Sequence, residues 1–280
     1  MAPIHPPAES EVVEIVGLAL KEDIGDGDIT ALLIPETTTA VANLVARQDA
    51  IICGIPWANE VLRQVDRNAE IIWHTIDGAS VSTDQHLAQL KGNARSLLTA
   101  ERCMLNFLQT LSGTATLSRH YAEMVSHTSV TLLDTRKTLP GLRGAQKYAV
   151  RVGGCSNHRM GLYDAYLIKE NHIRASGSIH NAIATAKQLK PEAIVEVEIE
   201  RLDQLEEALD CGVDIVMLDN FTLADLQIAV RLNRKRAKLE ASGGITCQNL
   251  VVIAESGVDY ISLGALTKDC KSVDLSLLFT

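Results

Sequence analysis

Basic side chains are concentrated in one short part of an otherwise acidic chain. Between Asp134 and Arg174, eight lysines and arginines stand against three acids, so this stretch carries +5 while the whole 280-residue chain carries −9. Clustered ammonium and guanidinium groups repel one another unless a ligand with several negative charges lies between them. The clustering predicts a site for a small polyanionic ligand, and a solvated basic surface is the alternative that charge alone leaves open.

Lys169 lies in this stretch and has a side chain suited to three kinds of chemistry. A lysine at the end of a strand can contact an anion, transfer a proton or form a Schiff base. A Schiff-base lysine needs a lowered pKa, whereas neighbouring anionic ligands raise it, so an aldolase-type role is the weaker interpretation. His158, beside Arg159, is a better functional candidate than His172, although a histidine that flanks a strand is more often structural.

Two carboxylates, Glu198 and Asp219, end β-type runs of their own. They could hold Mg²⁺ directly or through water, or accept hydrogen bonds from sugar hydroxyls. Glu196 shares a strand face with Glu198, because side chains two residues apart along a strand point the same way. One of these two glutamates could instead pair with a lysine of the pocket.

Small residues follow the last two β-type runs and form a candidate phosphate cradle. Such residues let backbone N–H groups approach a phosphate, which a following helix N-terminus also attracts. Tight turns use the same residues, so this alternative stays open. The candidates are Ser242, Gly243, Gly244, Gly264 and Ala265.

The elements that must position these residues alternate between strand and helix in the second half of the chain. The repetition of β-type runs and amphipathic stretches indicates parallel βαβ units. Polar or glycine clusters follow nearly every run, and barrels place their active sites at the carboxyl ends of strands. Six such clusters favour a barrel over an open doubly wound sheet, which concentrates function at one switch point. The runs lie at 131–134, 165–169, 194–199, 215–218, 238–241 and 260–263.

The first half of the chain has the mixed pattern of an α+β unit. Apolar spacing predicts helices at 9–21, 56–65 and 100–111, and β-branched runs predict strands at 39–47, 50–53 and 70–75. Thr99 is the expected N-cap of the third helix. Arg102 and Asn106 then lie on one face of that helix, away from its apolar stripe, and a solvated surface is the simplest use for them.

Composition excludes several classes of protein. A chain with 46% hydrophobic, 22% charged and 4% aromatic residues and a pI near 5.4 is typical of a globular enzyme and unlike a nucleic-acid binder. No apolar run approaches a membrane span, and residues 1–10 lack the pattern of a secretory signal, so we expect a cytoplasmic protein without a membrane partner. The six cysteines are widely spread without a Cys-x-x-Cys pair, which predicts reduced, structural thiols.

Longer strings of the chain share a pattern that is specific to one family. They lie at 132–143, 147–162, 165–172, 195–198, 217–221 and 262–267, with further matches at 22–30, 54–55 and 99–113. Together they resemble the quinolinate phosphoribosyltransferase family, also called nicotinate-nucleotide pyrophosphorylases (carboxylating). The resemblance extends over nearly the whole chain.

The resemblance implies an N-terminal α/β sandwich domain, residues 1–112, joined to an incomplete α/β barrel, residues 113–268. Residues 269–280 would return to the first domain. It also implies a homodimer, or a higher assembly, in which the N-terminal domain of one subunit closes the barrel of the other. Arg102 would then enter the active site of the partner subunit.

The reaction implied by the resemblance joins quinolinate to 5-phosphoribosyl 1-pyrophosphate, giving nicotinate mononucleotide, pyrophosphate and CO₂ in NAD biosynthesis. Such an enzyme is a pentosyltransferase, and both of its substrates are polyanions. By match to the family, quinolinate would meet Arg102, Thr135, Arg136, His158, Arg159 and Lys169. The phosphoribosyl donor would meet Lys137, Glu198, Asp219, Ser242, Gly243, Gly244, Gly264, Ala265 and Lys268. The expected catalytic residues are Lys137, Lys169, Glu198 and Asp219, the last two also with Mg²⁺.

Two other interpretations compete with this one. A paralogue of the same fold would use another acceptor, and a non-catalytic barrel would only bind phosphorylated ligands. The set of Arg102, Arg136 and Arg159 with His158 favours a dicarboxylate acceptor. Asp269 departs from the family pattern beside Lys268, where it could weaken donor binding or pair with that lysine.

Overall fold

The computed structural model describes residues 4–280 as two compact units. The first unit contains the described residues up to His120 together with Thr138–Gly154 and Leu266–Thr280, and the second contains Tyr121–Lys137 and Cys155–Ala265. Residues 1–3, part of the start that we expected to lack a targeting signal, lie outside the described residues. Among residues 4–280, no helix is both long enough and apolar enough to cross a membrane. All six cysteines are free.

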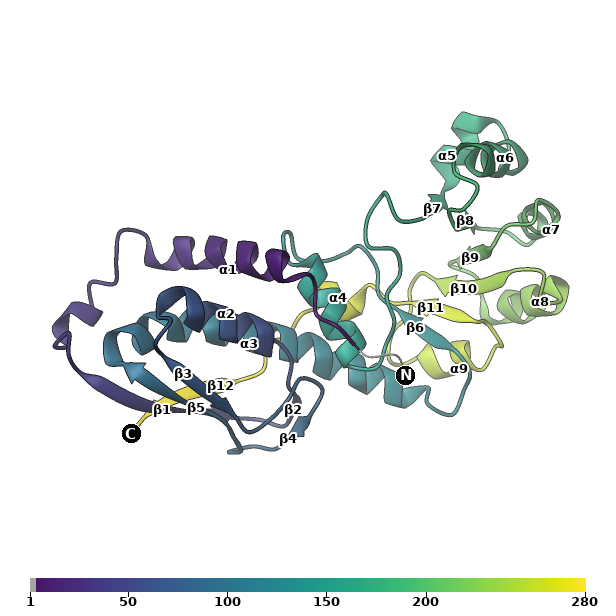
Figure 1. Ribbon diagram of the computed structural model, residues 1–280. Coiled ribbons are helices and arrows are strands. Elements are labelled where there is room, and N and C mark those ends of the chain that lie inside the picture. The colour runs from purple at the N-terminus through teal and green to yellow at the C-terminus, as the bar shows by residue number, and fades with distance from the viewer. Residues whose placement is uncertain (1–3) are drawn as a thin grey trace. The chain divides into compact units, whose positions relative to one another are not determined.

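Helices and a four-stranded antiparallel sheet build the first unit (Figure 1). The sheet has the order β12-β1-β5-β3, so the last strand of the chain pairs with the first. Trp57, Leu90 and Met104 are fully buried in its core, which large apolar side chains of α2, β5 and α3 fill. The elements are α1 (Glu9–Ile24), η1 (Ala31–Leu33), β1 (Thr39–Ala46), β2 (Ala50–Ile51), α2 (Ile55–Val65), β3 (Glu70–Trp73), β4 (Ser80–Val81), β5 (His86–Asn93), α3 (Ala94–Met124), α4 (Arg143–Val152), α10 (Ala265–Lys268) and β12 (Leu275–Phe279).

The helix α3 is longer than predicted, and the predicted N-cap was wrong. Asn93, at the end of β5, accepts the backbone N–H groups of Arg95 at 2.9 Å and Ser96 at 3.4 Å, so the helix begins at Ala94. An asparagine side chain is as good a cap as a threonine, and this one lies earlier in the chain. Thr99 is inside the helix, where its hydroxyl donates to Asp28 at 2.9 Å.

The predicted division of α3 into two faces is confirmed. Arg102 and Asn106 are exposed, whereas the expected apolar stripe of Met104, Leu105, Leu108 and Leu111 is buried. One side of the helix therefore packs in the core of the first unit, and the other presents a cation and an amide to solvent.

The compact units do not divide the chain at residue 112. The helix α3 continues to Met124, and the end of α4 packs closely on it. A Cβ atom at Gly153 would lie 2.4 Å from Ser118 Cβ and 2.5 Å from the carbonyl oxygen of Ala115, so only a glycine allows this approach. Residues 138–154 thus belong to the first unit. The predicted domain limits, 1–112 with 269–280 and 113–268, stay a prediction that is distinct from these units.

A six-stranded parallel sheet forms the centre of the second unit, as predicted. Its order is β6-β11-β10-β9-β8-β7, with β6 and β7 as the two edges, which is the arrangement of an incomplete barrel. The helices that follow the strands lie along the outer side of the sheet in Figure 1. The strands are β6 (Thr131–Leu133), β7 (Tyr166–Ile168), β8 (Val195–Ile199), β9 (Ile215–Asp219), β10 (Lys238–Ser242) and β11 (Tyr260–Ser262), and the helices are α5 (Glu170–Ser176), α6 (Ile179–Leu189), α7 (Asp203–Asp210), α8 (Leu223–Asn233) and α9 (Leu250–Ala254).

Candidate active site

The carboxyl ends of the six strands carry most of the predicted site residues. Because parallel strands end at the same edge of a sheet, the residues that follow them share one rim. Two predicted residues, Arg102 in α3 and Lys268 in α10, belong to the first unit instead, and Lys268 pairs there with Asp269 at 3.4 Å. The rim residues are Thr135, Arg136 and Lys137 after β6, Lys169 after β7, Glu198 in β8, Asp219 in β9, Ser242, Gly243 and Gly244 at the end of β10, and Gly264 and Ala265 after β11.

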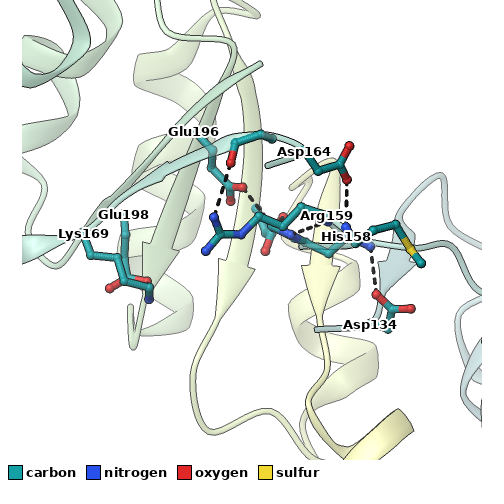
Figure 2. A network of polar contacts seen from close by, with 10 residues as sticks. Asp134, His158, Arg159, Asp164, Lys169, Glu196 and Glu198 are labelled. Carbon is teal, nitrogen blue, oxygen red and sulfur yellow. Dashed lines mark hydrogen bonds and ion pairs between the residues drawn. The ribbon is translucent and has the colours of Figure 1, made fainter. Parts of the chain in front are cut away.

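Lys169 and Glu198 form an ion pair across the neighbouring strands β7 and β8 (Figure 2). The lysine side chain is 46% exposed and the glutamate side chain 14%, so a ligand in the rim can reach the ammonium group. The backbone N–H of Lys169 donates to Nδ1 of His172 at 3.0 Å, which fixes the start of α5. Glu198 is therefore the glutamate that pairs with a lysine, and His172 holds the backbone of that lysine.

Lys137 packs across the bare backbone of Gly264 at the neighbouring ends of β6 and β11. A Cβ atom at Gly264 would lie 3.1 Å from Lys137 Cδ and 3.7 Å from Thr135 Oγ1. The backbone N–H of Lys137 donates to that threonine hydroxyl at 3.1 Å. The glycine thus leaves the space in which Thr135 and Lys137 turn toward the rim.

The two glycines after β10 differ in what surrounds their Cβ positions. Gly243 has φ +90°, and a Cβ atom there would lie 2.2 Å from Asn220 Oδ1, so the turn itself requires a glycine. Asn220 donates its backbone N–H to the Ser242 carbonyl at 2.9 Å and its side-chain amide to Asp219 at 2.8 Å. Gly244 also has a positive φ, but in residues 4–280 no atom beyond the glycine and its two chain neighbours lies within 4 Å of its Cβ position. Only this second glycine faces the open space that a phosphate cradle needs.

A buried aspartate anchors the loop that leads to His158. Asp134 is fully buried directly after β6, and it accepts the Asn157 side chain at 2.6 Å and the backbone N–H of His158 at 2.9 Å. The same loop pairs with the sheet through a parallel bridge between Leu133 and Ser156. Sequence reasoning counted Asp134 among the strand-end residues but missed this anchoring role.

His158 lies between an arginine and two buried glutamates. Its Nε2 atom is 2.9 Å from Glu196 Oε2 and 3.6 Å from Glu240 Oε2, and its Nδ1 atom accepts the backbone N–H of Arg159 at 2.8 Å. Figure 2 shows the Glu196, His158 and Arg159 side chains side by side. Because Nδ1 accepts a hydrogen bond, the neutral ring carries its proton on Nε2, and this N–H donates a hydrogen bond to Glu196.

Glu240 was missed by the sequence analysis, although a glutamate inside an apolar strand was a signal for it. Burial, which removes water from the carboxylate, raises the pKa of Glu240 to about 8, and the negative charge of Glu196 contributes to that rise. The His158 ring and the Ser262 hydroxyl oppose this rise in pKa, and Glu198 adds to it. Glu240 therefore carries a proton at neutral pH.

The strongest evidence for an anion site is the pair of Arg136 and Arg159. Burial lowers the pKa of the Arg159 guanidinium, and the positive charge of Arg136 lowers it further, against the opposing charges of Glu196 and Asp164. Arg159 Nη1 donates to the Ala165 carbonyl at 3.3 Å, and Arg136 Nε is buried without a hydrogen-bond partner in residues 4–280. Two guanidinium groups that repel each other, one with an unused buried donor, match a ligand with carboxylates.

A cavity of about 470 Å³ adjoins this cluster. His158, Arg159, Glu196 and Glu240 line it, and so do the first residues of β6, β9 and β11, so it extends toward the amino-terminal edge of the sheet. Arg159, His158 and the two glutamates therefore lie along this cavity in the second unit.

Glu198 and Asp219 fit the requirements of Mg²⁺ better than the buried cluster does. Glu198 pairs in register with Met217 of β9, and Asp219, two residues farther on, points to the same face. Both offer the carboxylate oxygens that Mg²⁺ prefers. His158, Glu196 and Glu240 also offer three ligand atoms within 4.8 Å of one another, but Nδ1 accepts the Arg159 N–H, so Nε2 would have to give up its proton to bind a metal.

Comparison with known proteins gives consistent matches over both units. The family description "Quinolinate phosphoribosyl transferase, N-terminal domain" matches residues 28–112, and "Quinolinate phosphoribosyl transferase, C-terminal domain" matches residues 114–278. A probable nicotinate-nucleotide pyrophosphorylase [carboxylating] of Bacillus subtilis (strain 168) is 42% identical over 91% of this chain and 89% of its own. The nicotinate-nucleotide pyrophosphorylase [carboxylating] of Mycobacterium leprae (strain TN) is 41% identical over 92% of this chain and 94% of its own.

Solved structures agree with the sequence matches. The nicotinate-nucleotide pyrophosphorylase from Francisella tularensis is 48% identical, covers 100% of both chains and superposes with a TM-score of 0.97. NadC from Streptococcus pyogenes is 36% identical over 99% of both chains, with a TM-score of 0.93. The similarity therefore includes the whole chain and both halves of the fold.

Proposed function

Because the chain belongs to the quinolinate phosphoribosyltransferase family, we propose that the strand-end rim of its second unit is where the family reaction takes place. The chain is a pentosyltransferase that joins quinolinate to 5-phosphoribosyl 1-pyrophosphate and releases pyrophosphate and CO₂. The product is nicotinate mononucleotide, so the reaction is a step of de novo NAD biosynthesis. Each step of this reaction has candidate residues in or beside the rim.

Quinolinate binds at Arg136 and Arg159 in this proposal. The observation that carries it is the buried Nε–H of Arg136, which has no partner in the described residues and lies in the electrostatic field of Arg159. A carboxylate between the two guanidinium groups would accept that donor and offset their repulsion. Thr135, His158 and Lys169, with Arg102 of a second subunit, complete the proposed acceptor site.

The phosphoribosyl donor occupies the ends of β9, β10 and β11. Gly244 leaves open space above its backbone, and Gly264 leaves room for Lys137. Lys137 would then stabilise the charge that develops on departing pyrophosphate. Ser242, Gly243, Gly244, Gly264 and Ala265 would surround the 5-phosphate, and Lys268 would contribute a further positive charge.

Glu198 and Asp219 stabilise the ribose as its C1 carbon becomes cationic. Both would accept hydrogen bonds from the ribose hydroxyls, and their negative charges lie on one face of β8 and β9. We propose that they also hold Mg²⁺, which would neutralise pyrophosphate as it leaves. Lys169 now bonds to Glu198, so donor binding would release the lysine for the acceptor.

Loss of CO₂ follows the transfer and leaves a carbanion beside the positively charged ring nitrogen, so the substrate itself stabilises the electron pair. The protein must hold the remaining carboxylate and deliver one proton to this carbon. Lys169 is exposed enough to do so. A Lys169→Ala variant should lose turnover with quinolinate, and normal turnover would remove this residue from the mechanism.

The assignment of the reaction is tested by product analysis. The purified protein is incubated with Mg²⁺, 5-phosphoribosyl 1-pyrophosphate and either quinolinate or nicotinate, and CO₂ and nicotinate mononucleotide are measured. We expect equal amounts of both products from quinolinate alone. No product despite donor binding would indicate a paralogue with another acceptor, and binding without release of pyrophosphate would indicate a protein that only senses its ligand.

The proposed homodimer is supported by the exposed Arg102 on α3, which the first unit does not use in its core. If Arg102 of one subunit completes the site of the other, two inactive variants can restore each other. Arg102→Ala and Lys169→Ala are mixed, allowed to exchange subunits and assayed. A mixed dimer should regain about one intact site, whereas no recovery in a confirmed mixed dimer would exclude the shared site.

We propose a cytoplasmic location, where free thiols such as those of this chain persist.

A further inference from the structure

A line of contacts connects a buried glutamate to the proposed acceptor site. Glu196 bonds Nε2 of His158 at 2.9 Å, and Nδ1 of the same ring accepts the backbone N–H of Arg159 at 2.8 Å. We propose that Glu196 is a positioning residue, which acts through His158 to hold Arg159 in the orientation that the dicarboxylate acceptor requires. This inference rests on the proposed role of Arg159 and adds to it a residue that does not touch the substrate.

The imidazole of His158 works as a bridge because both of its nitrogen atoms have protein partners. Nδ1 accepts a hydrogen bond, so the neutral ring has its one N–H on Nε2, and that proton points to Glu196. The ring therefore transmits the position of Glu196 to the peptide group of Arg159.

The peptide chain on both sides of the ring is also fixed. Asp134, fully buried, accepts the backbone N–H of His158 at 2.9 Å and the side chain of Asn157 at 2.6 Å. Asp134 holds the backbone, and the hydrogen bonds of the ring to Glu196 and to the Arg159 N–H restrict its rotation about the side-chain bonds. Arg159 Nη1 then reaches the Ala165 carbonyl at 3.3 Å, beside Arg136.

Glu240 closes the space behind the ring. Its side chain is fully buried, and one of its oxygens lies 3.6 Å from His158 Nε2, too long for a hydrogen bond but in contact with the ring. The cavity of about 470 Å³ next to it would otherwise give the ring room to turn. Glu196 thus accepts the hydrogen bond from the ring, and Glu240 fills the space into which the ring could turn.

Steady-state kinetics with both substrates varied provide the test. In Glu196→Ala the ring loses its acceptor, and we expect the KM for quinolinate to rise about 10-fold to 100-fold, the range for one hydrogen bond to a charged group. The KM for the phosphoribosyl donor should change less than about twofold, since uniform damage would raise both. Glu196→Gln keeps an oxygen that accepts the Nε2 proton and should restore most of the quinolinate affinity. Glu200→Ala, an exposed glutamate directly after β8, is the matched control.

A spectroscopic signature separates positioning from general damage. In protein labelled with ¹⁵N-histidine, His158 should show the tautomer with its proton on Nε2, and Glu196→Ala should lose that signature while Glu196→Gln keeps it. The signal is assigned with His158→Asn. If Glu196→Ala does not fold, Glu196→Leu fills the volume without an acceptor and takes its place.

Three results would overturn the inference: an unchanged KM for quinolinate, an equal rise in both KM values, or no restoration in Glu196→Gln. Arg159→Ala distinguishes this failure from failure of the proposed site. If Arg159→Ala leaves the quinolinate KM unchanged, the site assignment fails as well. If Arg159→Ala raises it and Glu196→Ala does not, only the positioning role is wrong.

Discussion

Replacing Glu240 with glutamine should remove a large part of the pH dependence of stability in the second unit. The side chain is fully buried, and the pKa of its carboxyl group is raised from 4.5 to about 8, first by burial and then by the charge of Glu196. Between these two pKa values the folded protein holds a proton that the unfolded chain releases. Stability therefore falls as the pH rises through this window, because unfolding is favoured when protons become scarce.

The size of the effect follows from proton linkage. One proton held only by the folded state changes the free energy of unfolding by about 1.4 kcal/mol per pH unit. Between about pH 5.5 and about pH 7.5, both within the window, the free energy of unfolding of the wild-type protein should fall by about 3 kcal/mol. That of Glu240→Gln should not show this fall. The amide resembles the protonated carboxyl group, so the two proteins should be nearly equal only below about pH 4.5, and at about pH 5.5 the variant should already be about 1.4 kcal/mol more stable. The variant should be the more stable one at the higher pH.

The assay must report on the second unit. Both tryptophans, Trp57 and Trp73, lie in the first unit, so their fluorescence would follow the wrong part of the chain. Urea unfolding followed by far-ultraviolet circular dichroism, with hydrogen exchange of the β10 amides, gives the difference between variant and wild type at each pH. The exposed Glu200→Gln serves as control and should follow the wild type throughout. A difference between Glu240→Gln and wild type that stays constant with pH would refute the reasoning.

Three further substitutions test contacts that the structure shows directly. Gly264→Ala puts a Cβ atom 3.1 Å from Lys137 Cδ, so the KM for the phosphoribosyl donor should rise about 10-fold with quinolinate binding kept; an unchanged donor KM would contradict the proposed role of this lysine. Asn93→Ala removes the acceptor at the start of α3 and should lower stability by about 1 kcal/mol, with Asn93→Ser much closer to wild type in urea unfolding. Gly153→Ala places a Cβ atom 2.5 Å from the Ala115 carbonyl oxygen, so the first unit should lose about 2 kcal/mol or more, seen in tryptophan fluorescence; a wild-type unfolding midpoint would show that α4 can move away.

Local patterns in the sequence determined the parallel sheet and the positions of its strand ends. Each of the six strands was predicted within about two residues, because short β-branched runs end in polar or glycine clusters. Residue spacing also determined that Glu196 and Glu198 share a face, and that Arg102 and Asn106 lie together on α3. The family strings extended these local predictions to the reaction, and the comparisons confirmed the family.

Local patterns failed where two nearby residues compete for one role or where the contact joins distant segments. Thr99 has the residue type of an N-cap, but Asn93 precedes it on the chain and caps the helix earlier. The pairing of Lys137 with the backbone of Gly264 joins residues far apart in the sequence, and neither residue reveals it alone. Such contacts depend on strand order, which is a property of the whole sheet.

Only the tertiary structure determined which carboxyl group pairs with a lysine at the rim and which carboxyl groups are buried beside His158. Sequence reasoning assigned a role to Glu198 and left open which of Glu196 and Glu198 pairs with a lysine; in the structure Glu198 reaches the exposed Lys169, while Glu196 contacts His158 inside the unit. Glu240 stood out in the sequence only as a glutamate inside an apolar run, and its neighbours became known only when β10 placed it beside His158 and Glu196. The charge and reach of a side chain are set by residue type, but its pKa depends on how much water and which charges surround it. That environment is assembled from three separate segments of the chain, so it exists only in the folded protein.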